Sequence, residues 1–108
     1  MHRNAAARAA FEHGLKIAPG AAALYENLGL LFYRERDYKS AKEFLARAVA
    51  LGSEKPGVRF SLAASRLRTG EPRRALDELV ELEPQFGKLA AYWDERGRAE
   101  MLKDPAAA

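Results

Sequence analysis

The sequence contains no cysteine, only two histidines and few β-branched residues. Without cysteine there can be no disulfide, thiolate metal site or cysteine nucleophile, although the cellular compartment stays open. The sequence has no long uncharged run that could span a bilayer. Its first five residues lack the apolar core of a signal peptide. We therefore expect no membrane insertion. We favour a cytoplasmic protein, or a periplasmic one if the sequence belongs to a longer chain.

The residues that are present favour a folded helical domain. The 108 residues suit one domain, and 48% hydrophobic with 31% charged residues is ordinary for a soluble one. Alanine, leucine, glutamate, arginine and lysine dominate, and these residues have high helix propensity. The abundance of alanine and arginine also suggests a GC-rich bacterial source. A net charge of +3 is modest and does not by itself indicate a nucleic-acid partner.

A shift of 34 residues aligns the sequence with itself. Small residues, large apolar residues and turn residues recur at the same places in this period. The aligned sets are Ala7, Ala41 and Ala75; Phe11, Leu45 and Leu79; Gly14, Ala48 and Leu82; Gly29, Ala63 and Gly97; Leu28 and Leu62; and Tyr25 and Trp93.

Inside each period, apolar residues recur at three- and four-residue steps, which is typical of amphipathic helices. Glycine and proline punctuate the pattern at Pro19–Gly20, Gly52–Gly57 and Pro84–Gly87. Asp37 and Glu71 are aligned acidic residues that we expect to cap the helices after them. The pattern predicts no strands and six helices, over residues 3–17, 21–34, 38–51, 56–69, 72–82 and 87–102.

This pattern resembles the tetratricopeptide repeat (TPR), whose Trp/Leu/Gly/Tyr helix is followed by an Ala/Phe/Ala helix. The matching residues are Tyr25, Leu28, Gly29, Phe32, Ala41, Leu45 and Ala48. The resemblance implies an all-α, right-handed superhelix of about six antiparallel helices. It divides residues 1–102, as one domain, into a second half-repeat (3–19), two full repeats (22–55, 56–89) and a first half-repeat or capping helix (90–102), before a disordered tail (103–108). We expect the chain to be cut from, or adapted to, a longer array.

Small residues at Gly29, Ala63 and Gly97 would let paired helices approach closely. Arginine replaces the family's aromatic residue at Arg66, and we expect its aliphatic stem to follow an apolar seam with the guanidinium in water. Further departures from the family pattern are Arg59, Arg96 and Glu100. Since Trp93 aligns with Tyr25, we interpret it as a packing residue rather than a binding hot spot.

The resemblance implies that the first helix of each pair lines a concave, peptide-binding groove. The groove residues would be Glu26, Asn27, Leu30, Tyr33, Arg34, Phe60, Ser61, Ala64, Leu67, Arg68, Asp94, Glu95 and Arg98. Some family members clamp a chain-terminal carboxylate with lysine, asparagine and arginine. Asn27 matches the asparagine, but Gly57 and Ser61 stand where basic residues would be, so we expect an apolar-anchored ligand instead.

Two other functions are compatible with the sequence. The half-repeats at the two ends could stack on other copies or other repeat units, because Ala6, Ala10 and Phe11 would lack their usual cover. An acidic partner or nucleic acid could use the basic run Arg59–Arg74, formed by Arg59, Arg66, Arg68, Arg73 and Arg74. We interpret this run as an ordinary helix surface, broken by Glu71.

Catalysis and cofactor binding have little support. There is no glycine-rich phosphate loop, and no serine stands in a nucleophile-elbow setting. Glutamates at 12, 26, 78 and 81 are spread over helices in the manner of solvated carboxylates. Neither His2 nor His13 has a second ligand at helical spacing, so we predict no metal site and no cofactor.

Overall fold

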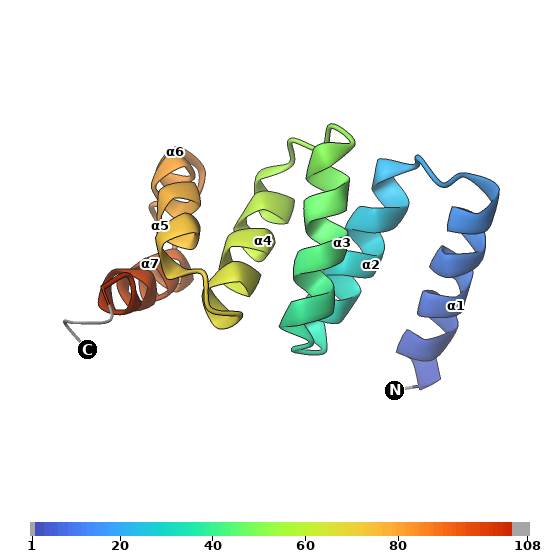
Figure 1. Cartoon of the computed structure of the whole chain (residues 1–108), viewed down its shortest axis with the longest axis horizontal. Coiled ribbons are helices and arrows are strands. Elements are labelled where there is room, and N and C mark those ends of the chain that lie inside the picture. The colour runs from blue at the N-terminus through green and yellow to red at the C-terminus, as the bar shows by residue number, and fades with distance from the viewer. Residues whose placement is uncertain (1, 105–108) are drawn as a thin grey trace.

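The computed structural model describes residues 2–104, and helices follow one another along its 46 Å long axis (Figure 1). They are α1 (His2–Ile17), α2 (Ala22–Arg34), α3 (Tyr38–Ala50), α4 (Pro56–Arg68), α5 (Pro72–Glu81), α6 (Glu83–Phe86) and α7 (Ala90–Leu102). These residues contain no strand, so the predicted all-α class is confirmed. Of the predicted disordered tail, residues 105–108 lie outside the described part, while Lys103 Nζ lies 3.0 Å from Glu100.

Six of these helices correspond to the six predicted ranges, with ends that differ by a few residues. The prediction was wrong between Pro84 and Gly87, where a turn was expected and α6 forms instead. Pro84 stands in the first turn of α6, where its missing N–H costs no hydrogen bond. As a result α7 begins at Ala90, three residues later than predicted.

The two turns that join α2 to α3 and α4 to α5 share a backbone shape. Arg36 and Gly70 are aligned in the repeat, and both have positive φ, at 63° and 90°. The caps that follow differ. Asp37 Oδ1 accepts a hydrogen bond from Ser40 N at 3.2 Å, as predicted. Glu71 caps nothing, because its carboxylate instead lies 2.9 Å from Lys42 Nζ.

Two apolar clusters form the core, and α4 contributes to both. The first joins α2, α3 and α4 through Leu28, Phe32, Ala41, Leu45, Val58 and Leu62. The second joins α4, α5 and α7 through Ala63, Leu67, Ala75, Leu76, Leu79, Leu82, Tyr92 and Ala99. Each helix pair therefore completes its core only with the next helix along the axis, which is how stacked repeats gain stability.

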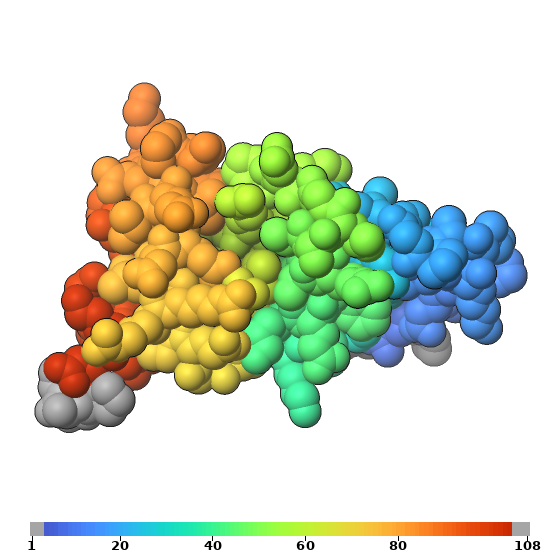
Figure 2. Space-filling view, turned by 45° about the horizontal axis from the view of Figure 1, so that its top comes forward, coloured from blue at the N-terminus to red at the C-terminus, as the bar shows by residue number. Residues whose placement is uncertain are grey.

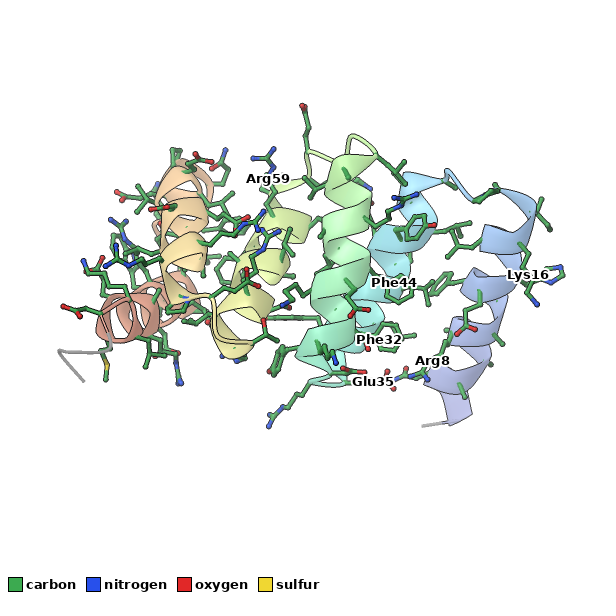
Figure 3. All side chains as sticks on the ribbon, in the orientation of Figure 1. Arg8, Lys16, Phe32, Glu35, Phe44 and Arg59 are labelled. Carbon is green, nitrogen blue, oxygen red and sulfur yellow. The ribbon has the colours of Figure 1, made fainter. Side chains whose placement is uncertain are left out.

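Close approach between paired helices depends on the predicted small residues. A Cβ added at Gly29 would lie 2.5 Å from Leu45 Cγ, so α3 packs directly on the α2 backbone. Beside this contact the Phe32 and Phe44 rings stack with centroids 5.3 Å apart (Figure 3). Ala63 is fully buried in the second cluster, as predicted. The prediction fails at Gly97, where an added Cβ would meet nothing within 4 Å among the described residues.

Helix α1 packs against α2 at both of its ends. Near its C-terminus, a Cβ at Gly14 would lie 3.0 Å from Leu24 Cδ1. Near its N-terminus, Arg8 reaches the last turn of α2, where its Nη2 lies 3.0 Å from Glu35 Oε1 (Figure 3). The Arg8 guanidinium also lies 4.8 Å from the centre of the Phe32 ring.

Candidate binding groove

A hollow of about 520 Å³ lies between α2 and α4. We call it the α2–α4 hollow. Its lining residues come from the second half of α2, from the first half of α4 and from the residue before α4. They are Leu30, Tyr33, Arg34, Lys55, Gly57, Val58 and Ser61.

The start of α4 keeps this hollow open. Pro56 is the first residue of α4 and suits that position because its φ is already helical. Gly57 follows it, and a Cβ there would meet nothing within 4 Å among the described residues. On the opposite wall, Tyr33 packs edge-on against Tyr38 with ring centroids 5.7 Å apart. Burial raises the pKa of Tyr33, so its hydroxyl stays protonated at neutral pH.

Two cations stand at the rim of the α2–α4 hollow. Arg34 is exposed at the end of α2 and forms no ion pair within the described residues. The Lys55 side chain is 72% exposed, and its Nζ lies 2.9 Å from Glu26 Oε1. The floor between them is apolar, with Leu30 half-buried and Val58 buried. The hollow therefore combines an apolar floor with a positive rim.

A second hollow, of about 270 Å³, continues from the first toward α1. Leu30 and Arg34 line both hollows, so they form the ridge between them. Its other lining residues are Asn4, Ala7, Phe11, Asn27 and Leu31. Together the two hollows make a groove that crosses α1, α2 and α4, which we call the α1–α4 groove.

The predicted groove residues divide into three groups in the structure. Leu30, Tyr33, Arg34 and Ser61 line the α2–α4 hollow, and Asn27 lines its continuation. Ala64, Leu67 and Phe60 belong to the packed interior or its margin. Glu26, Arg68, Glu95, Asp94 and Arg98 are engaged in ion pairs within the chain. Sequence reasoning missed Lys55, Gly57 and Val58, because it took ligand contacts only from the middle turns of each first helix.

Glu26 is buried and is not the solvated, ligand-facing carboxylate that was predicted. Ser53 Oγ donates a 2.6 Å hydrogen bond to its carboxylate, and Lys55 Nζ lies 2.9 Å away. The hydrogen bond from Ser53 lowers the pKa of Glu26 despite its burial. Glu26 therefore ties the loop before α4 to α2, and it positions Lys55 at the rim.

Arg68 and Glu95 were predicted to meet a ligand, but they meet each other. Both guanidinium Nη atoms donate 2.7 Å hydrogen bonds to the Glu95 carboxylate, which links α4 to α7. The guanidinium also lies 5.1 Å from the centre of the Tyr38 ring. The Glu95 hydrogen bonds raise the pKa of Arg68, so the arginine stays charged. Bidentate pairs of this kind hold a fixed geometry, and this one fixes α4 against α7.

Phe60, which was predicted to line the groove, packs at the margin of the second core cluster. Its ring centroid lies 5.1 Å from that of Phe86 and 6.3 Å from that of Tyr92. The interior needs this aromatic residue because α6, which carries Phe86, was not foreseen. Leu67 is likewise buried in that cluster.

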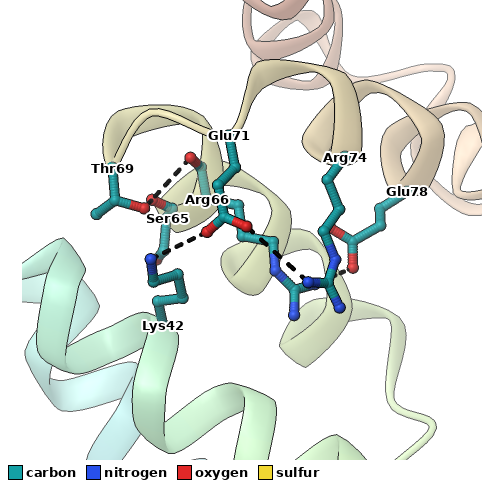
Figure 4. Close-up of polar contacts among 7 residues, drawn as sticks. All are labelled: Lys42, Ser65, Arg66, Thr69, Glu71, Arg74 and Glu78. Carbon is teal, nitrogen blue, oxygen red and sulfur yellow. Dashed lines mark hydrogen bonds and ion pairs between the residues drawn. The ribbon is translucent and has the colours of Figure 1, made fainter.

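The basic run does not form one positive surface. Arg66 is buried in a hollow of about 380 Å³ between α3 and α5, where α4 is recessed (Figure 2). Its guanidinium pairs with Glu78, contrary to the prediction that it lies in water (Figure 4). Glu78 is half-buried, and its loss of solvent raises its pKa although Arg66 lowers it.

The other members of the run also have partners or face elsewhere. Arg74 Nη1 lies 3.9 Å from Glu71 Oε1 (Figure 4), and Arg73 Nε donates a 3.2 Å hydrogen bond to the Lys103 carbonyl oxygen. Arg59 lines the same hollow as Glu81. Because acidic residues are interleaved with these arginines, little unpaired positive charge remains for phosphate groups.

The comparisons with known proteins add no assignment. No family model matches the chain, and the search of curated proteins finds no match. Within the described residues, no helix combines the length and apolar character needed to cross a bilayer. In the same residues, no three histidine, aspartate or glutamate side chains gather closely enough to hold a metal ion. Within the described residues, the α1–α4 groove combines an apolar floor with exposed cations at its rim.

Proposed function

We propose that this chain is a TPR-type repeat module that acts by binding, and that its ligand is an extended peptide segment of another protein. The α2–α4 hollow carries the proposal, because it joins an apolar floor to Arg34, which has no ion pair within the described residues, and to Lys55, which pairs with Glu26 but is 72% exposed. The repeat register supports it, since the 34-residue period, the pairing of α2 with α3 and the small residue at Gly29 agree with that family's pattern.

The chemistry of the hollow favours a segment with one large apolar side chain beside a carboxylate. An apolar side chain buried over Leu30 and Val58 would contribute about 1.5–3 kcal/mol. A carboxylate near Arg34 and Lys55 would add about 1 kcal/mol or less, because both cations remain in water. The apolar anchor would thus dominate affinity, and the charges would select acidic over basic segments.

A peptide library provides the test. One set of immobilised 12-residue peptides carries Leu or Phe at the centre beside Asp or Glu, and a matched set carries Lys or Arg in place of the acid. We expect the chain to bind members of the acidic set in preference to the basic set. Gly57→Gln should abolish that binding, because the new side chain fills the hollow while α4 gains helix propensity. Arg34→Glu should reverse the preference between the two sets.

Matched controls separate the hollow from general effects. Gly57→Ala improves the helix in the same way but adds little volume, so it should retain binding. Lys39→Glu makes the same charge change as Arg34→Glu on exposed α3, outside the hollow. Equal binding of both peptide sets, or binding that survives Gly57→Gln, would contradict the proposal.

A further inference from the structure

Helix α7 presents a face that no other part of residues 2–104 covers. Ala90, Trp93, Gly97 and Met101 lie on one side of the helix, since they are spaced three or four residues apart. All four are exposed, with Trp93 46% and Met101 72% accessible. The opposite side of α7 is packed, with Tyr92 and Ala99 fully buried against the second core cluster. We call the exposed side the open face of α7.

The repeat shows what kind of element covers such a face. Gly29 aligns with Gly97, and Leu45 of α3 fills the notch at Gly29. Tyr25 aligns with Trp93. The ring of Phe44 in α3 lies beside the Tyr25 ring, with centroids 6.1 Å apart. The open face of α7 therefore carries the same notch and an aromatic residue at the same flanking position, but no helix of residues 2–104 lies in the place of α3.

Helix α1 has the residues of the missing partner. It is aligned with α3, so Phe11 takes the place of Leu45 and Ala10 takes the place of Phe44. A larger knob, Phe11, would enter the notch at Gly97, while the smaller Ala10 would leave room for the larger Trp93. Ala6, Ala10 and Ile17 are exposed along α1, and Ile17 is 74% accessible.

Apart from α6, each described helix takes the place of either the first or the second helix of a repeat pair. Two of these helices lack the other member of their pair within the described residues. Helices α1, α3 and α5 share one register, and α2, α4 and α7 share the other. Helix α2 pairs with α3, and α4 pairs with α5. Helices α1 and α7 therefore remain without a repeat partner in the described residues. These two lie at opposite ends of the long axis and cannot meet within one chain (Figure 1).

We propose that α1 of one chain docks on the open face of α7 of a second copy, so that the two complete one helix pair across the contact. The contact joins two different surfaces, head to tail, and can therefore repeat into rings or longer arrays. It rests on the repeat register and on the open face of α7; Phe11 is the residue that it shares with the lining of the α1–α4 groove. It also sharpens the assembly alternative by naming the two helices and the notch.

Two blocked variants test the contact. Gly97→Gln fills the notch of α7 and leaves its own α1 free, whereas Ala10→Glu places a charge on exposed α1 and leaves its own α7 free. By sedimentation velocity at rising concentration, the unmodified chain should exceed the mass of one 12.0 kDa chain. Each variant alone should stay at the mass of one chain. An equal mixture should form a species of two chains and stop there, because both remaining ends are blocked.

A control variant and three contrary outcomes complete this test. Ala91→Gln makes a similar enlargement on the same exposed helix, but about a third of a turn away from Gly97, and should assemble like the unmodified chain. An unmodified chain that keeps the mass of one chain up to about 1 mM would overturn the proposal, and the open face would then await another protein or a further segment. Assembly that persists in Gly97→Gln, or blocked variants that do not pair, would also overturn it. Peptide binding by Gly97→Gln should be unchanged, so this result and that for the groove can be told apart.

Discussion

Gly29 and Gly97 occupy the same position of the repeat, two periods apart, yet their surroundings differ completely. Leu45 lies against the Gly29 backbone, whereas nothing described lies near Gly97. Glu26 and Asp94 are aligned in the same way. Glu26 is buried beneath Ser53 and Lys55, while Asp94 is exposed and pairs with Arg98 on its own helix. The residue alone does not decide its role, because the element that follows it in the stack supplies the contacts.

The largest expected effect comes from enlarging the covered glycine. Gly29→Val should destabilise the fold by about 3 kcal/mol, since its methyl groups would overlap Leu45 and force α2 from α3. Gly97→Val should leave stability within about 0.5 kcal/mol, because its side chain enters open space. Urea unfolding followed by circular dichroism, at a protein concentration low enough to keep the chains separate, compares the two variants. Equal losses would mean that α7 is covered within a single chain.

Truncating the aligned side chains Leu45 and Phe11 to alanine should give a smaller difference in folding stability. Leu45→Ala removes a fully buried side chain and should cost about 2–4 kcal/mol. Phe11→Ala removes a half-buried ring, which packs at the margin of the first cluster, and should cost about 1 kcal/mol. Thermal unfolding at low protein concentration measures the cost within one chain. A larger cost for Phe11 would show that α1 already packs as completely as α3.

Alanine at the two glycines should change stability in opposite directions. Gly97→Ala should stabilise the chain by about 0.5–1 kcal/mol, because an exposed helix interior gains from losing glycine. Gly29→Ala should destabilise it, since even one methyl group meets Leu45 at 2.5 Å. Differential scanning calorimetry of both proteins reports the signs. A stabilising effect at Gly29 would indicate that Leu45 moves aside at little cost.

The smallest expected effect on stability appears at acid pH. It concerns Glu26, the buried one of the two aligned acidic residues Glu26 and Asp94. Because the pKa of Glu26 is lowered in the fold, its contribution to stability is present above about pH 4.5 and is lost as the pH falls through its folded pKa. Ser53→Ala removes the hydrogen bond that lowers this pKa, so it should make acid unfolding begin at higher pH. Unfolding free energies measured between pH 3 and pH 7 test this. An unchanged pH profile would assign the acid sensitivity to other carboxyl groups.

The binding groove shows how far sequence reasoning reaches. The resemblance to the repeat family assigned Leu30, Tyr33 and Arg34 to the groove, and these residues do line the α2–α4 hollow. It could not find Lys55 or Gly57, because their access to the hollow depends on where the chain enters α4. The same reasoning mistook Glu26 for a solvated residue, since Ser53 is 27 residues away in the sequence.

The sequence by itself determined six of the seven described helices, the 34-residue period and the small residues at Gly29 and Ala63. These features follow from interactions between residues three and four positions apart, which the order of amino acids sets directly. Only the tertiary structure decided which small residue is covered, which carboxylates are buried and which arginines are paired. Those outcomes depend on contacts between elements distant in the sequence, and among the described residues no such element lies within 4 Å of a Cβ added at Gly97.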